Sequence, residues 1–162
     1  MHKLLVVVAL VLLANRQSSA QNSSAADRAG VESFNRAFDE ATRRMDTRGT
    51  LALWEENGVS LLPSTRPIVG KAAITAFING VMASLPNAHM ESFVNRCYDI
   101  TVSGSWASEW CVEHQIVLLP EGKRFDGWGK MSLVLHRAAD GVWRLRQEMW
   151  NQAEPADSVM VR

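Results

Sequence analysis

Residues 89–119, HMESFVNRCYDITVSGSWASEWCVEHQIVLL, are the stretch that decides the expected fold. Two runs with strand-like composition, His89 to Val102 and Trp106 to Leu119, flank Ser103-Gly104, a dipeptide typical of hairpin turns. We therefore predict a long antiparallel hairpin in the second half of the chain.

A second hairpin is expected directly after it. Phe125 to Arg137 and Val142 to Gln152 lie on either side of Asp140-Gly141, another turn dipeptide. Within the first of these strands, Met131 to Leu135 has little polar character on either face, so both faces are expected to be covered. Because helices can cover only one face, we predict that a second copy covers the other in a homodimer.

The half of the chain before these hairpins has helical periodicity. The first predicted helix, of about 18 residues, carries apolar residues at spacings of three and four: Val31, Phe34, Phe38, Ala41 and Met45. Asp46-Thr47 is expected to cap a second, shorter helix that includes Leu51 and Trp54 and ends at Asn57-Gly58.

A short strand and a third helix complete this half. Val59 to Leu62 is predicted as the strand, which Pro63 ends. Gly70 begins the third helix and Pro86 ends it. Its predicted apolar face consists of Ile74, Phe77, Ile78, Val81, Met82 and Leu85.

Helices followed by antiparallel hairpins predict an α+β fold with helices and sheet in separate layers. Strands this long in so short a chain have to curl. Three N-terminal helices packed on the concave side of a strongly curved, mainly antiparallel sheet would enclose a cavity, and we expect the function there.

The first 20 residues have the anatomy of a signal peptide. Met1-His2-Lys3 is basic, and Leu4 to Ala14 is an uncharged apolar run of 11 residues, whereas a membrane-spanning helix needs roughly 20. Ser18 and Ala20 are small residues suited to cleavage before Gln21. We expect an exported protein, periplasmic or secreted, with no membrane attachment after cleavage.

The predicted domain organisation follows from these boundaries. Residues 1–20 are the signal peptide, residues 21–27 a flexible Ser- and Ala-rich leader, residues 28–152 one domain and residues 153–162 a C-terminal tail. A single core is expected, since 47% of the residues are apolar.

Charge and histidine content exclude several classes of function. Without Lys3 and Arg16 of the signal peptide, 15 basic and 17 acidic residues remain and form no basic stripe, so nucleic acid is not an expected partner. The four histidines show no metal-ligand spacing, and no metal or other cofactor is expected.

Several short motifs in this order resemble one superfamily: Leu53-Trp54-Glu55-Glu56-Asn57-Gly58, Gly70-Lys71-Ala72-Ala73-Ile74, Val102-Ser103-Gly104-Ser105-Trp106-Ala107, Asp140-Gly141-Val142-Trp143-Arg144-Leu145 and Glu148-Met149-Trp150-Asn151. From about Val31 to Gln152 the chain is similar to the nuclear transport factor 2-like superfamily, and its end resembles the SnoaL-like exported proteins, which are known mainly as a domain of unknown function. The resemblance implies a cone-shaped fold and a homodimer.

This superfamily includes isomerases, dehydratases, cyclases and non-catalytic binders, so the fold alone does not define the activity. Its ketosteroid isomerases carry a catalytic carboxylate and a tyrosine at positions that correspond here to Leu62 and Phe38. The resemblance therefore argues against ketosteroid isomerase chemistry in this chain.

Glu148 is the first candidate catalytic residue. It lies near the end of the last strand beside Trp150, and a carboxyl group against an indole in a dry pocket has a raised pKa that suits general acid–base catalysis. The alternative is structural, because simple alternation places Arg144 and Arg146 on the same strand face as Glu148, where they would pair with it.

Glu113 and His114 are the second candidates. Consecutive side chains in a strand point to opposite faces, so only one of the two can enter the cavity and they cannot form a dyad. The structural alternatives are a Glu113 pair with Arg96 and a core position for His114.

Large side chains are expected either to fill the core or to line the ligand pocket. The predicted pocket residues are Phe38, Trp54, Phe77, Tyr98, Trp110, Met131 and Trp150. If several of them line the cavity, the ligand is flat or apolar.

Whether Cys97 and Cys111 form a disulfide depends on the hairpin register. If Gly104 is the centre of the turn, the two cysteines face each other and a disulfide can form. If Ser103-Gly104 are the two central residues of a tight turn, the cysteines point to opposite faces.

The sequence leaves two hypotheses for the function. The first is an exported protein that binds a small apolar or flat molecule and acts as a cofactor-free acid–base enzyme of the isomerase, dehydratase or cyclase type. The second is a non-catalytic exported binding or accessory protein with the same fold.

Overall fold

The computed structural model describes residues 25–155, so the predicted signal peptide lies outside the described residues. These residues form three α-helices: one over residues 25–43, α2 (Thr47–Ala52) and α3 (Lys71–Ser84). The other elements are β1 (Trp54–Leu61), β2 (Ile68–Val69), β3 (His89–Ser103), β4 (Trp106–Leu118), the short 3-10 helix η1 (Pro120–Gly122), β5 (Arg124–Arg137) and β6 (Trp143–Ala153).

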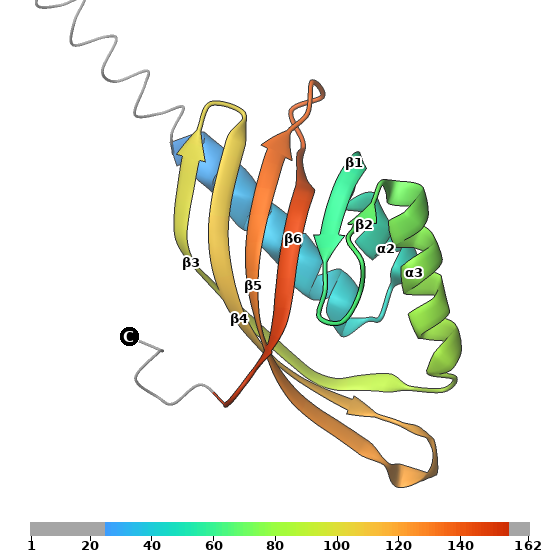
Figure 1. Ribbon diagram of the computed structural model, residues 1–162. Helices are drawn as coiled ribbons and strands as arrows, with labels where there is room; N and C mark the ends of the chain where they lie inside the picture. The colour runs from blue at the N-terminus through green and yellow to red at the C-terminus, as the bar shows by residue number, and fades with distance from the viewer. Residues whose placement is uncertain (1–24, 156–162) are drawn as a thin grey trace, which may run out of the picture.

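The six strands form one sheet in the order β2-β1-β6-β5-β4-β3. Only the β1–β6 pair is parallel. The first helix crosses one face of the sheet, α3 lies beside β1 and β2, and the long strands β3, β4 and β5 bend strongly so that their lower ends pass beneath α3 (Figure 1). The predicted α+β cone with a mainly antiparallel curved sheet is confirmed.

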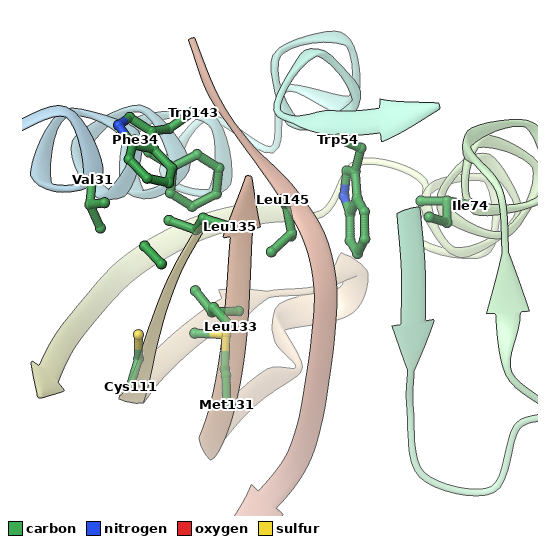
Figure 2. Close-up of a cluster of buried hydrophobic side chains, with 11 residues drawn as sticks. Val31, Phe34, Trp54, Ile74, Cys111, Met131, Leu133, Leu135, Trp143 and Leu145 are labelled. Carbon is green, nitrogen blue, oxygen red and sulfur yellow. The ribbon is translucent and has the colours of Figure 1, made fainter. Parts of the chain in front are cut away.

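The core lies between the first helix and the concave face of the sheet (Figure 2). Val31 and Phe34 of the helix pack against the cluster that includes Leu133, Leu135 and Leu145, and none of these five side chains is more than 4% exposed. Each buried side chain of this size stabilises the fold by roughly 1.5–3 kcal/mol relative to an exposed one.

The prediction that Trp54 belongs to the second helix was wrong. Trp54 is the first residue of β1 and not part of the second helix, and β1 runs through Asn57-Gly58 instead of beginning at Val59. The pairing of β1 with β6 is irregular between Trp54 and Val59. A Cβ atom on Gly58 would lie 2.6 Å from Cε3 of the Trp54 ring, so this glycine makes room for the buried indole rather than ending a helix.

The apolar face predicted for α3 is only partly buried. Ile74 is 2% exposed, whereas Phe77 is 36% and Val81 40% exposed. The reason is that α3 lies over β1 and β2 at the edge of the sheet (Figure 1). These two strands are too short to cover the whole apolar face of the helix.

The hairpin formed by β3 and β4 has neither of the two predicted registers at its turn. Ser103 pairs with Trp106, so Gly104 and Ser105 are the central residues. The register then shifts between Tyr98 and Thr101, and this bulge places Cys97 directly opposite Cys111. The two cysteines form a disulfide.

The middle of β5 is not covered on both faces. Met131, Leu133 and Leu135 are buried, whereas Ser132 is exposed and Val134 is half-buried. The apolar run therefore alternates between a core face and an outer face that no helix within residues 25–155 covers. A second copy of the protein would have to bind at that outer face.

The ends of the domain differ slightly from the expected boundaries. Residues 25–27, part of the predicted leader, are helical, and Asp27 pairs with Arg137 of β5. Strand β6 ends at Ala153, one residue inside the predicted tail. Within residues 25–155, no helix is both long and apolar enough to cross a membrane.

Candidate functional site

A cavity of about 220 Å³ lies between the helices and the β1–β6 side of the sheet. It is lined mainly by apolar side chains, with one carboxyl group, that of Glu148, among them. The lining residues are Phe38, Thr42, Thr50, Trp54, Ser60, Leu62, Ile68, Ile74, Phe77, Ile78 and Glu148.

Glu148 enters this cavity because of a bulge in β6. Leu145 pairs with Leu135 but Gln147 pairs with Val134, so Arg146 is an extra residue in the ladder. The bulge brings Glu148, which pairs with Leu133, to the same face as Leu145. Simple alternation would have placed the two on opposite faces.

The structural alternative for Glu148 was therefore wrong. Arg144 binds Asp140 at 2.7 Å, and Arg146 donates to the carbonyl oxygen of Asn57 and lies 4.0 Å from Glu55. Among the residues of the described range, no arginine or lysine forms an ion pair with Glu148.

The polar partner of Glu148 is Ser60, whose hydroxyl donates to Glu148 Oε2 at 3.1 Å. The two residues are neighbours in the parallel β1–β6 ladder. Burial raises the pKa of Glu148 to about 7; the Ser60 hydroxyl opposes this rise and the negative charge of Glu113 adds to it. A carboxyl group with a pKa near 7 can both accept and donate a proton at neutral pH.

Glu113 lies on the same concave face but does not line the cavity. It is 6% exposed, and the indole N–H of Trp150 donates to its Oε1 at 2.7 Å. Burial raises the pKa of Glu113, although the Trp150 hydrogen bond opposes this. The predicted pair with Arg96 does not form, because Arg96 pairs with Val112 in the ladder and is exposed.

Gly129 provides the space for this hydrogen bond. A Cβ atom at this position would lie 2.4 Å from Trp150 Nε1 and 2.7 Å from Glu113 Oε1. Any larger residue would push the indole and the carboxylate apart.

His114 lies on the opposite face, as alternation along the strand predicts. Its ring stacks on Trp128 at 4.3 Å, and its Nε2 lies 2.7 Å from Asp126 Oδ1. His114 therefore contributes nothing to the cavity, and neither histidine nor tyrosine is among the lining residues.

The predicted pocket residues divide into three groups. Phe38, Trp54 and Phe77 line the cavity. Met131 and Trp150 lie on the concave face beyond it, where Met131 belongs to the core and Trp150 binds Glu113.

Tyr98 and Trp110 are the third group, and their placement in the pocket was wrong. Their rings stack at 4.5 Å on the outer face of the sheet. Each is next in sequence to a disulfide cysteine whose side chain points inward, so alternation along the strand turns both rings outward.

Ser60 was not among the predicted site residues. It is a single polar residue within the predicted apolar strand Val59 to Leu62, and this pattern could have indicated it. Leu62 and Phe38 both line the cavity. The resemblance described above places the carboxylate and the tyrosine of the ketosteroid isomerases at these two positions, whereas this cavity has an apolar group at each.

One group of three potential metal ligands occurs within residues 25–155: Cys97, Glu109 and Cys111, with ligand atoms within 4.8 Å of one another. The two sulfur atoms are joined in the disulfide, and a metal requires thiolates. The oxidised protein therefore has no ligand set at this position.

The geometry defines a class of protein: a cone-shaped α+β domain with a carboxyl group in an apolar cavity. Solved structures with this architecture identify the fold as nuclear transport factor 2-like. The sequence itself matches no protein-family model and no curated protein.

Three of these structures show the extent of the similarity. A ketosteroid isomerase-like protein from Erwinia carotovora atroseptica is 18% identical, with a TM-score of 0.68 over 78% of this chain and 96% of that one. A nuclear transport factor 2-like protein with a cystatin-like fold from Novosphingobium aromaticivorans is 19% identical, with a TM-score of 0.63 over 88% and 92%. A protein from Catenulispora acidiphila, solved in complex with S-DNPA, is 18% identical, with a TM-score of 0.64 over 79% and 94%.

Proposed function

We propose that this protein binds a small apolar or flat molecule in the cavity beside α3 and moves a proton on it without a cofactor. The observation that carries the proposal is the carboxyl group of Glu148, which lies in a mainly apolar cavity with a serine hydroxyl beside it. None of the lining residues in the described part of the chain is basic. Isomerisation, dehydration and cyclisation all begin with such a proton transfer.

The size of the cavity indicates the size of the ligand. An engineered apolar cavity of about 150 Å³ holds a benzene molecule, and pockets for drug-sized ligands range from roughly 300 to 1,000 Å³. At about 220 Å³, this cavity suits a molecule with a single ring.

In the proposed reaction, the Glu148 carboxylate removes a proton from carbon next to a carbonyl group, and the resulting carboxylic acid returns it at another position. The lining of the cavity is mainly apolar, and electrostatic interactions are stronger in such surroundings than in water. Ser60 holds one carboxylate oxygen, so the other is directed to the substrate. The Thr42 and Thr50 hydroxyls are the lining groups that can donate a hydrogen bond to the developing oxyanion.

The test follows hydrogen–deuterium exchange at the α-carbon of cyclohexanone by NMR in D2O at pH 7.5. We expect exchange above the buffer rate with the wild-type protein and a loss of at least 100-fold with Glu148→Gln. Glu154→Gln removes an exposed carboxylate and serves as the control. Exchange that is equal in the wild type and Glu148→Gln would rule out the catalytic role.

A non-catalytic binding protein is the second candidate. The observation in its favour is that Glu148 is the one ionisable group among the lining residues, so the cavity has no charged donor for an oxyanion. Quenching of the tryptophan fluorescence by cyclohexanone in the wild type but not in Trp54→Phe, without α-carbon exchange, would support this candidate.

We also propose that the protein is exported. The disulfide supports this, because such bonds persist mainly in oxidising compartments. N-terminal sequencing of the protein from its own organism is expected to start at Gln21. A chain that still begins at Met1 would refute export.

A homodimer through the outer face of the sheet is a further part of the proposal. The helices of the described range leave this face uncovered, and it carries four exposed apolar side chains: Val94 (46%), Trp106 (46%), Trp110 (38%) and Met149 (44%). We expect a dimer in sedimentation at micromolar concentration, weakened by Trp110→Glu. A monomeric wild type would remove this proposal.

A further inference from the structure

The disulfide joins two cysteines in unequal surroundings. Cys111 is on β4, an interior strand, and is 0% exposed. Cys97 is on β3, the edge strand (Figure 1), and is partly exposed. A thiol from solution can therefore approach only one of the two sulfur atoms.

Cys97 also lines a second hollow, separate from the Glu148 cavity. It has a volume of about 310 Å³ and lies between the first helix and the edge strand. Its lining is mainly polar: Arg28, Glu32, Asn35, Arg36, Asp39, Asn95, Cys97 and Ile100.

A buried carboxyl group lies next to the two sulfur atoms. Glu109 is 4% exposed, and one of its carboxylate oxygens lies within 4.8 Å of both sulfurs. Asn35 donates to Glu109 Oε2 at 2.9 Å, while Oε1 is buried without a hydrogen-bond partner in the described part of the chain. On the other side, Asn95 Nδ2 lies 3.6 Å from Cys97 Sγ.

The surroundings of Glu109 raise the pKa of its carboxyl group. Burial raises the pKa of Glu109 and the negative charge of Asp39 adds to this, whereas the Asn35 hydrogen bond and the positive charge of Arg28 oppose it. From β5, the pairing residue is the apolar Leu133. A protonated carboxyl group within 4.8 Å of a leaving thiolate can deliver its proton directly or through one water molecule.

We propose that Cys97–Cys111 is a thiol-reactive disulfide at which a small anionic thiol forms a mixed disulfide with Cys97. The incoming thiolate forms a bond to Cys97 Sγ, and the bond between the two cysteines breaks. The electron pair leaves with Cys111 Sγ, which takes the proton of Glu109. A second thiol then attacks the mixed disulfide, so that two thiols are oxidised to their disulfide and the two cysteines are reduced.

The hollow also determines which thiol is preferred. Arg28 pairs with Glu32, but Arg36 forms no ion pair within residues 25–155. Because Arg36 lines the hollow, its guanidinium group can bind the carboxylate of an anionic thiol. Glutathione is therefore the probe of choice, and cysteamine, a cationic thiol, is the matched comparison.

The first experiment treats the folded, oxidised protein with glutathione, alkylates free thiols and maps the adduct by peptide mass spectrometry. We expect the glutathione on Cys97 and the alkyl group on Cys111, with a faster reaction than cysteamine gives at equal thiolate concentration. An adduct on Cys111 would overturn the proposal, and so would reduction that occurs only in unfolding concentrations of urea. Equal rates with the two thiols would remove the role of Arg36.

The second experiment tests Glu109. We expect Glu109→Gln to slow formation of the Cys97 adduct at pH 7 about tenfold. Glu91→Gln, an exposed change on the edge strand β3 that also carries Cys97, should leave the rate unchanged. A Glu109→Gln rate equal to the wild type would overturn the role of Glu109. If this variant does not fold, the adduct position in the wild type still decides the proposal.

Discussion

Replacing Glu148 by glutamine separates the charge of this residue from its shape. Glutamine has nearly the same size, and its side-chain oxygen can still accept the hydrogen bond of the Ser60 hydroxyl. The variant lacks only the ionisation of a buried carboxyl group. Its effect on stability should therefore depend on pH in a way that the structure defines.

The size of this effect on the free energy of unfolding follows from the pKa of Glu148, which rises from an ordinary value of 4.5 to about 7 in the folded protein. At about 1.4 kcal/mol per pKa unit, this rise corresponds to about 3 kcal/mol. Because the folded state binds the proton more tightly than the unfolded state, the free energy of unfolding decreases as the pH rises from about 4.5 to 7. Above pH 7 the full cost of the buried carboxylate remains.

Glutamine does not incur this cost. We expect Glu148→Gln to have nearly the wild-type free energy of unfolding at pH 4.5 and to be more stable by up to about 3 kcal/mol at pH 8. Urea denaturation at pH 4.5, 6 and 8, followed by tryptophan fluorescence, measures the difference. Glu154→Gln, at an exposed position, should change the stability by less than about 0.5 kcal/mol at each pH. The same difference between Glu148→Gln and the wild type at pH 4.5 and at pH 8 would refute the argument.

Four other substitutions test the surroundings of the site and the helices. Ser60→Ala removes the hydroxyl that opposes the effect of burial, so the pKa of Glu148 should rise above its wild-type value. Carboxyl NMR measures this pKa, and an unchanged value would show that the hydrogen bond is absent. Gly129→Ala places a Cβ atom 2.4 Å from Trp150 Nε1 and should lower the free energy of unfolding, measured by urea denaturation, by about 1–3 kcal/mol. Gly80 lies in helix α3, and a Cβ atom there would meet no other atom within 4 Å, so Gly80→Ala should raise the free energy of unfolding by up to about 1 kcal/mol. Asp46→Ala removes the carboxylate that accepts a hydrogen bond from the Gly49 N–H at 2.9 Å and should lower the free energy of unfolding by about 1 kcal/mol in the same assay. An unchanged free energy of unfolding would mean that α2 needs no cap.

The predictions that rested on local patterns agree with the structure. Strands β3, β4, β5 and β6 lie within one or two residues of the predicted runs, because turn dipeptides and β-rich composition act over a few neighbouring residues. Asp46 caps α2 and Gly70 precedes α3, as expected from the side-chain and backbone chemistry of these residues.

The predictions that failed all involve a contact or a register over a longer distance. Gly58 indicated a helix end, but its missing side chain accommodates the Trp54 ring. The register shift in β3 between Tyr98 and Thr101 and the bulge in β6 changed which residues face each other. A bulge has no required residue type at most positions, so alternation counted along the sequence continues past it unnoticed.

The amino-acid sequence by itself determined the α+β class, the two hairpins and Glu148 as the first candidate. These follow from periodicity, turn chemistry and the proximity of Glu148 to Trp150 along one strand. Only the tertiary structure decided that Glu148 enters the cavity with Ser60 as its partner and that Cys97 meets Cys111. Both depend on strands paired in space with one extra residue on one side, and the energy of that choice comes from packing across the whole sheet rather than from the residues at the bulge.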